Sequence, residues 1–566
     1  MLKYSKTNAL KYQIIDESIE KKEYWKALRL LNSIMQENPD IQAIKLAYKL
    51  HSKLVSYVGI ADDLVKMLVS NDAEAIMVGA RGLIEFARNH NQNADCYYNF
   101  AAKKLKPFID ANSKEVFDQL LGFSDKKSTF HFVEKPNKTL KIIEKIDKLM
   151  NDGDFGAASQ IAQQSASEDA SLITKMSIES LLIEKKYKEA FAQIKKIKKD
   201  DEDTYFKCLK FRTQYKLKQT NESSISELTG IEIKFPEEII FVVEALFDAK
   251  KPEIVIDFIE KYEEKFEFYY PMHFAKGIAY LNLKNCKQAE KSFKNAYILN
   301  PRQVAAKEMY LMLEKGKKFA GKISIHGRFP KEVLIEIDKK YKSIMQLSDL
   351  EFCKLSIGKI EEMLYWLEMM HSEKTIEQYL LRLICCKNGV EAIKGILLSF
   401  QTSDWLKQQC IKMLVFSGAN DVNIYYTISN NLKSVNLLLP TVIENESEVS
   451  ETGYYSENIS YEKVMYAYAE AYSQLAMESE KFEDRLQEVA SYLINTIMEL
   501  YPKQKSDKIP TKLIVAAMLY CTCSDAAGTT FASEKANNKS FTTFSTTATR
   551  LDLPEEELKK FVKQIF

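Results

Sequence analysis

Glycine and proline are both scarce in this chain of 566 residues, which has 17 Gly and 12 Pro. These two residues interrupt helices more strongly than any others. Their scarcity therefore favours long helices with few breaks. The hydrophobic content of 46% is enough for several cores, so the chain has room for several domains or for one long helical solenoid.

Arginine is also scarce, because only nine of the 80 basic residues are Arg. Acidic residues number 79, which leaves a net charge of +1. Arg is the residue that binds phosphates and guanine edges with two parallel hydrogen bonds. A chain that coats nucleic acid usually carries a clear positive excess. The composition therefore disfavours nucleic acid as the main partner.

Long apolar runs are missing as well. No run approaches the roughly 20 residues that cross a bilayer, and the first residues lack the apolar core of a signal peptide. We therefore expect a cytoplasmic protein with no membrane span. The nine cysteines are scattered through helical patterns, as reduced core thiols would be; they are Cys96, Cys208, Cys286, Cys353, Cys385, Cys386, Cys410, Cys521 and Cys523.

Signatures of catalysis, metal binding and cofactor binding are not found in the sequence. The Cys385–Cys386 pair and the Cys521–Cys523 pair have no second pair at zinc spacing. Residues 316–322 spell most of a phosphate-binding loop, but Ile323 follows where Ser or Thr would bind magnesium. This segment also follows a helix end instead of a strand, so we interpret it as a lysine-rich linker. We expect no enzyme activity, no cofactor and no metal.

The most informative stretch runs from residue 270 to residue 301. Two helix-like segments there are separated by a turn, and the positions that would face each other are small or aromatic. Small residues let two helices approach closely, aromatic residues fill the space beside them, and proline ends the second helix. These positions are Gly277, Tyr280, Ala289, Phe293, Ala296 and Pro301. The pattern resembles the tetratricopeptide repeat (TPR), a helix–turn–helix unit of 34 residues.

Related spacings recur along the chain. Residues 7–39 look like one further unit, with Ala27, Leu31 and Pro39 at matching positions and Ile15 in place of the glycine. Positions equivalent to Ala289 recur at intervals of about 33 residues, at Ala158, Ala190, Ser224 and Val255. The spacing predicts about five stacked hairpins between Lys138 and Lys315. The fold class that we expect is all-α, an α-solenoid of TPR-like hairpins.

Changes of composition suggest five segments. We expect N-terminal helical repeats at 1–133, a TPR-like solenoid at 138–318 and a less regular helical region at 333–442. Residues 443–460 are acidic and lack Lys and Arg, so they read as a linker. Residues 461–566 then form a helical module.

The end of that module has the spacing of a helix-turn-helix, and it weakly resembles the cyclin-like fold of transcription-factor cores. Its apolar positions are Ala548, Leu551, Leu553, Leu558 and Val562. Asp552 and Glu555 fit a capping box for the last helix. Glu555, Glu556 and Glu557 would repel DNA phosphates at the helix end that reads bases, whereas Lys559, Lys560 and Lys563 would favour backbone contact.

The resemblance to the TPR family implies a groove lined by the first helix of each hairpin. In this sequence it places six residues there: Phe274, Ile278, Leu281, Asn282, Lys175 and Glu179. They do not reproduce the Lys/Asn clamp of the family's chaperone-tail binders, so an amphipathic helix or an apolar peptide is the expected ligand. The alternative is that they only pack between repeats. We expect a protein-interaction scaffold; the alternative is a regulator whose C-terminal module contacts nucleic acid.

Overall fold

The computed structural model describes most of the chain. The described residues are 2–36, 40–54, 56–89, 95–108, 116–117, 121, 146, 149–150, 155–164, 170–195, 203–317, 319, 323, 330–370, 373–418, 423–428, 431–440, 459–479, 481–500, 509–524 and 539–565. The predicted acidic linker therefore lies almost wholly outside them, and α25 begins at its end.

The described residues are mainly helical, which confirms the predicted all-α class at this level. The chain divides into two compact units, and each is assembled from separate pieces of sequence. Unit 1 comprises residues 1–33, 49–56 and 124–342; unit 2 comprises 34–48, 57–123 and 343–566. The five-segment division stays a prediction.

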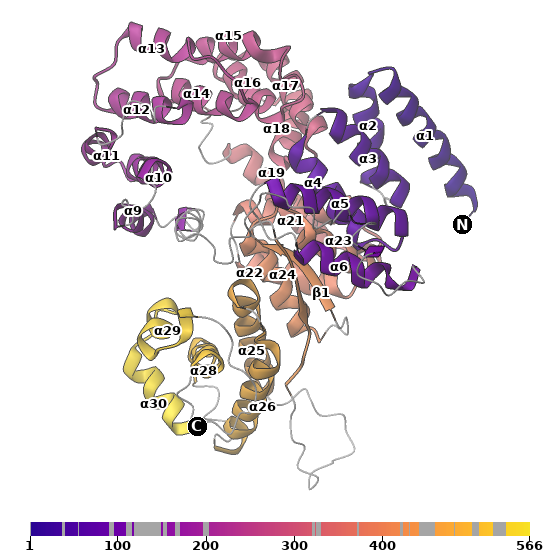
Figure 1. The fold of residues 1–566 in the computed structure, drawn as a ribbon, viewed down its shortest axis with the longest axis vertical. Coiled ribbons are helices and arrows are strands. Elements are labelled where there is room, and N and C mark those ends of the chain that lie inside the picture. The colour runs from indigo at the N-terminus through magenta and orange to yellow at the C-terminus, as the bar shows by residue number, and fades with distance from the viewer. Residues whose placement is uncertain are drawn as a thin grey trace. The chain divides into compact units, whose positions relative to one another are not determined.

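Unit 1 is a series of helices, and from α9 to α18 each helix packs against the next along the chain. In Figure 1, α12 and α14 lie along one side of this series and α13 and α15 along the other. Its helices are α1 (Leu2–Glu20), α2 (Tyr24–Met35), α9 (Phe155–Gln164), α10 (Ala170–Ile183), α11 (Tyr187–Ile194), α12 (Thr204–Lys216), α13 (Glu222–Thr229), α14 (Pro236–Asp248), α15 (Pro252–Glu263), α16 (Tyr270–Asn282), α17 (Cys286–Leu299), α18 (Val304–Glu314) and α19 (Lys331–Met345), the last ending in unit 2.

The turns between paired helices repeat the same backbone geometry. Lys185, Lys218, Lys250 and Lys284 each have a positive φ, between 57° and 63°. In each turn the next N–H returns to a carbonyl of the preceding helix, as from Asn285 to Tyr280 at 2.8 Å. This is the Schellman ending of a helix, in which a left-handed residue lets the chain reverse. The turns recur at intervals of about 33 residues, the period that the sequence predicts for a TPR-like repeat.

The core of unit 1 is densest where α12 to α16 meet. Apolar residues of α14 and α15 are fully buried there, among them Val242, Leu246 and Ile259. The N-terminal hairpin of α1 and α2 contacts the same unit near α16. The Trp25 ring lies 5.5 Å from Phe268, and its N–H donates to Glu267 at 2.7 Å. Residues about 240 positions apart in sequence therefore meet in one unit.

Unit 2 contains the remaining described helices and one β-hairpin. Its buried residues include the largest apolar side chain of the core, Trp366. Its elements are α3 (Ile41–Leu54, which ends in unit 1), α4 (Tyr57–Val69), α5 (Ala73–Asn89), α6 (Asp95–Leu105), η1 (Lys106–Phe108), α20 (Asp349–Phe352), α21 (Ile357–Met370), α22 (Glu373–Ile384), α23 (Lys387–Leu398), α24 (Asp404–Phe416), β1 (Asn423–Ile428), β2 (Asn431–Asn436), α25 (Ile459–Glu478), α26 (Glu483–Leu500), α28 (Thr511–Cys523), η3 (Lys539–Phe541), α29 (Phe544–Arg550) and α30 (Glu555–Ile565).

Residues 333–442, predicted to be a less regular helical region, also contain a β-hairpin that the prediction did not include. β1 and β2 pair antiparallel, with Ile424 opposite Val435 and Tyr426 opposite Lys433. The segment is rich in β-branched and aromatic residues, and such residues favour strands. A buried hydrogen bond secures it, because the Tyr426 hydroxyl donates to the Ala476 carbonyl of α25 at 2.5 Å.

The end of the chain also differs from the prediction. Asp552 does not cap α30: it has a positive φ of 52°, and its N–H returns to the Thr549 carbonyl, so it closes α29. A residue in this conformation cannot take the extended backbone of a helix N-cap. The capping box in this region instead involves Thr543 and Thr546, at the start of α29.

Two cysteines that were expected to be reduced core thiols are joined. Cys353 and Cys386 form a disulfide, with their Cα atoms 5.0 Å apart. The expectation failed because Cys353 lies at an exposed helix end and not in the core, and α20 and α23 bring the two ends together. The described cysteines with free thiols are Cys208, Cys286, Cys385, Cys410, Cys521 and Cys523, of which Cys286 and Cys385 are exposed.

Candidate partner-binding surface

The hairpin of α16 and α17 contains the residues that carry the TPR-like pattern in the sequence. A Cβ atom added to Gly277 would lie 2.7 Å from the Phe293 ring, so only glycine permits this approach of the two helices. Ala289, Phe293 and Ala296 are fully buried on α17. α17 ends at Leu299, two residues before Pro301.

The groove residues predicted on α16 have different environments. Phe274 is half-buried, and its ring packs edge-on against Phe293 with the centroids 5.6 Å apart. Ile278 is only 1% exposed, so its side chain belongs to the core of unit 1. Leu281 is half-buried. Asn282 both donates to and accepts from the backbone of Ile323, at 2.9 and 2.8 Å.

The two groove residues predicted on α10 make contacts with the start of α12. The buried Lys175 ammonium donates to Asp203 at 2.8 Å. Glu179 accepts a hydrogen bond from the Tyr205 hydroxyl. Both residues therefore already hold two neighbouring hairpins together. Their predicted contact with a partner stays a prediction.

A charged cluster follows on α12 and α14. Arg212 donates to Asp248 at 2.8 Å and lies 3.9 Å from Glu244, and Lys216 adds a second pair to Asp248 at 3.2 Å. The Arg212 side chain is only 11% exposed. Buried ion pairs are costly to desolvate, so both partners are needed for the arrangement to be stable.

Burial raises the pKa of one member of this cluster, Glu244. Loss of water around Glu244 raises the pKa of its carboxyl to about 7, and the charges of Glu179 and Asp248 act in the same direction. Arg212 lowers this pKa but does not cancel the other effects. Glu244 therefore changes charge near neutral pH, whereas an ordinary glutamate does so well below it.

The cluster is part of a longer series, which we call the charge ladder. Its members alternate in sign along the chain, and neighbours are about 33 residues apart. Within it Arg212 faces Glu244, and Lys340 forms an ion pair with Glu308. Lys276 instead pairs with Glu263 of α15 at 2.7 Å. The charge ladder comprises Glu179 on α10, Arg212 on α12, Glu244 on α14, Lys276 on α16, Glu308 on α18 and Lys340 on α19.

Aromatic side chains lie beside the ladder. The Tyr205 and Phe241 rings of α12 and α14 are 4.8 Å apart, and both are half-buried. Phe274 of α16 follows Phe241 at the interval of the repeat and is also half-buried. Aromatic residues are enriched at protein interfaces, so these half-buried rings are candidate contact residues.

Reasoning from the sequence missed most of this surface. Tyr205, Glu244 and Asp248 were not predicted as site residues. One signal was present: Glu179, Arg212 and Glu244 are separated by one repeat each. Comparing the sign of the charge at equivalent repeat positions would have identified the ladder. Some ion-pair partners of the ladder do not lie one repeat away, such as Glu263 for Lys276, so their positions could not be identified from the period.

Among the described residues no group of three or more His, Cys, Asp or Glu side chains is placed to hold a metal ion. The same residues include no helix long and apolar enough to cross a bilayer. No protein-family model matches the chain, and no curated protein sequence matches it.

Proposed function

We propose that this chain is a non-catalytic scaffold of the TPR type, which binds a peptide or protein partner on the face of α12, α14 and α16. The observation that carries the proposal is the repeating hairpin with a common Lys turn, whose first helices carry the half-buried rings of Tyr205, Phe241 and Phe274. Arrays of stacked hairpins offer an extended surface that suits a peptide or a helix of a partner.

The charge ladder narrows the kind of contact that the partner makes. Arg212, Lys276 and Glu308 are already paired within the chain, so a partner gains little from their charges. The binding energy must then come from the aromatic rings and the apolar stems around them. We therefore propose an apolar or amphipathic segment as the ligand, in a partner protein of the cytoplasm.

Site-specific photo-crosslinking tests this proposal on the full chain. A photoreactive phenylalanine analogue is placed at Phe241 or at Phe274, and in a control chain at Leu10, an exposed apolar residue of α1. In native cells we expect a discrete crosslinked product at the first two positions and none at Leu10. Products of equal size and yield at all three positions would contradict the proposal.

The alternative of nucleic-acid contact through α30 gains no support from its geometry. Lys559, which would have to reach a phosphate, pairs with Glu555 at 2.8 Å and with Glu556 at 2.9 Å. Glu555 to Glu557 occupy the first turn of α30, the end that a reading helix would present. A sequence-selective complex of the full chain with duplex DNA, weakened by charge reversal at Lys560 and Lys563, would restore this alternative.

A further inference from the structure

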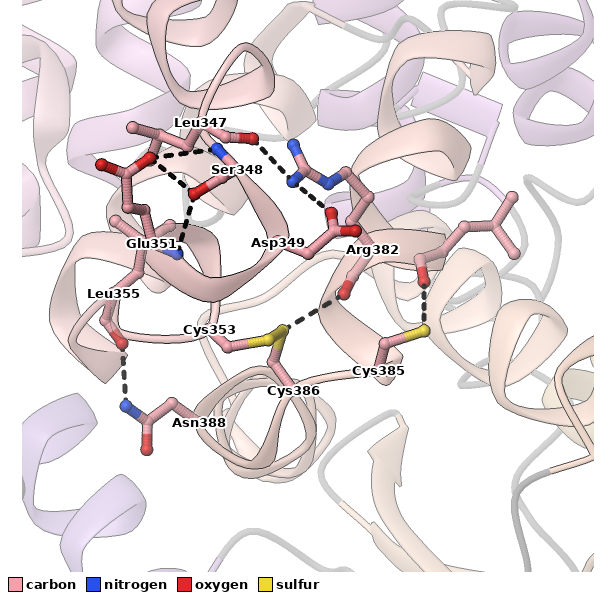
Figure 2. The surroundings of a disulfide bond; sticks show 11 residues. Leu347, Ser348, Asp349, Glu351, Cys353, Leu355, Arg382, Cys385, Cys386 and Asn388 are labelled. Carbon is pink, nitrogen blue, oxygen red and sulfur yellow. Dashed lines mark hydrogen bonds and ion pairs between the residues drawn. A yellow bond between two sulfur atoms is a disulfide. The ribbon is translucent and has the colours of Figure 1, made fainter.

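The disulfide between Cys353 and Cys386 lies at a corner of unit 2 where three helices meet. Cys353 is the residue after α20, and Cys386 is the residue before α23. The bond closes a loop between residues 33 positions apart. Figure 2 shows it between the end of α20 and the start of α23, with Arg382 of α22 beside it.

Non-covalent contacts hold this corner together independently of the bond. The Arg382 guanidinium donates to the carbonyls of Met345 and Leu347, each at 2.9 Å, and to Asp349 at 2.8 Å. Its carbon lies 4.1 Å from the centre of the Phe352 ring. The two cysteines therefore stay close when they are reduced, which gives them a high effective concentration for one another.

A second contact acts on the other side of the bond. The Asn388 amide of α23 donates to the Leu355 carbonyl at 2.8 Å, just beyond α20. At Gly389 an added Cβ would clash with the Leu383 carbonyl, so α22 and α23 join without space for a side chain. The position of Cys386 is thus fixed by its own neighbours in the sequence.

The two ends of the disulfide differ in access. Cys353 is exposed, whereas Cys386 is 4% exposed. Cys386 also occupies the N-cap position of α23, a helix of 12 residues, and its side chain caps none of the first N–H groups. Those N–H groups stabilise a negative sulfur at this position. An incoming thiolate reaches Cys353 more easily, and Cys386 is the better leaving group.

We propose that Cys353 is a covalent modification site for low-molecular-weight thiols, reached by exchange with the Cys353–Cys386 disulfide. In the first step the thiolate sulfur bonds to Cys353, the disulfide breaks, and Cys386 leaves as a thiolate that takes a proton from water. In the disulfide the Cys386 sulfur lies 3.5 Å from the Arg382 carbonyl, so the thiol that forms can donate to this carbonyl. A second thiol releases Cys353 and forms the oxidised dimer of the small thiol, so two thiols supply the two electrons.

Cys385 provides a matched control inside the same corner. It is exposed and has a free thiol, and it directly precedes Cys386. Figure 2 shows its sulfur directed along α22, 3.6 Å from the Leu381 carbonyl, and away from the disulfide. If exposure alone selected the site, Cys385 and Cys353 would react alike.

The experiment treats the full oxidised chain with reduced glutathione, traps thiols with N-ethylmaleimide and locates both groups by peptide mass spectrometry. Fragment spectra must separate Cys385 from Cys386, because no Lys or Arg lies between them. At early times we expect glutathione on Cys353 and maleimide on Cys386. The Cys385→Ser chain should behave like wild type.

Two further variants give the rates separately. With oxidised glutathione, the Cys386→Ser chain should form a stable glutathione adduct on Cys353. In the Cys353→Ser chain, glutathione should be added to Cys386 at least about tenfold more slowly than it is added to Cys353 in the Cys386→Ser chain. Early glutathione on Cys386, or equal amounts on both, would overturn the proposal. The proposal would also be overturned if oxidised glutathione gave the wild-type chain one adduct on Cys353, another on Cys386 and no Cys353–Cys386 disulfide. The wild-type time course needs no variant, so a variant that fails to fold leaves the test intact.

Discussion

The charge ladder of unit 1 and the buried Lys412 of unit 2 show two ways of placing charges inside a helical protein. In the ladder, charges recur with the repeat, and each contacts a helix that is near in sequence. Lys412 is a single residue with 1% of its side chain exposed, and it pairs with Glu377 at 2.5 Å and with Glu470 at 2.6 Å. Its ammonium also lies 4.5 Å from the Tyr466 ring.

The two arrangements differ in which helices they hold together. A ladder fixes how each hairpin stacks on its neighbour, and an error there affects one junction. The Lys412 cluster joins α22, α24 and α25, so it fixes the position of an element from the C-terminal part of unit 2. The two carboxylates raise the pKa of the Lys412 ammonium against the effect of burial, so its charge persists.

The largest effect is therefore expected at Lys412. Lys412→Ala leaves Glu377 and Glu470 facing each other without a cation, which we expect to lower the free energy of unfolding of unit 2 by about 3–5 kcal/mol. Urea denaturation followed by the fluorescence of Trp366 and Trp405, both in unit 2, measures it.

Two variants test the cause of that loss. Lys412→Met combined with Glu377→Gln and Glu470→Gln should recover most of the stability, because no buried charge remains. Lys394→Ala removes a cation whose pair with Glu391 is exposed, and should change stability by less than about 1 kcal/mol. An equal loss in Lys412→Ala and Lys394→Ala would show that burial is not the cause.

A second effect is expected in the ladder, from pH. The folded pKa of Glu244 is about 7, above the ordinary value of 4.5. Between these values the folded state binds more protons than the unfolded state, so stability falls as pH rises. The contribution is complete below pH 4.5 and is lost through pH 7, with a size of up to about 3 kcal/mol.

Glu244→Gln isolates this contribution. The glutamine stays neutral at every pH, so unit 1 should lose the corresponding fall in stability between about pH 4.5 and 7, the interval set by the two pKa values. Hydrogen exchange of α12 and α14 peptides at each pH measures it. If wild type and variant change in parallel, the carboxyl of Glu244 is not the group that titrates.

A third effect tests the close contact of α16 and α17. Gly277→Ala places a methyl group 2.7 Å from the Phe293 ring, and such overpacking should cost about 1–3 kcal/mol. Gly395→Ala is the matched control, because it also lies inside a helix but meets only the Glu361 side-chain oxygen at 3.1 Å. That variant should be neutral or gain up to about 1 kcal/mol from helix propensity. Thermal melting that gives both variants the same shift would remove the special role of Gly277.

Some of these contacts could be predicted from the sequence alone, and others could not. The period, the turn positions and the close helix pair at Gly277 depend on residues close together in sequence, so a pattern could reveal them. The groove prediction was less complete, since burial of Ile278 and the double hydrogen bond of Asn282 depend on neighbouring elements. The pairing of Lys412 with Glu470 and the β-hairpin follow no period. The cysteines of the disulfide are 33 residues apart, but nothing in the sequence shows that they are joined.

The smallest effect concerns the turn that the repeats share. Lys284 has a φ of 61°, a conformation that a side chain disfavours and glycine does not. Lys284→Gly should therefore stabilise the α16–α17 hairpin by about 0.5–1 kcal/mol. Lys291→Gly, at an exposed position in the middle of α17, should instead destabilise by about 1 kcal/mol. Hydrogen exchange of α17 amides measures both changes. Opposite signs support a turn common to the repeats, whereas two losses would mean that the Lys284 side chain contributes more than its backbone costs.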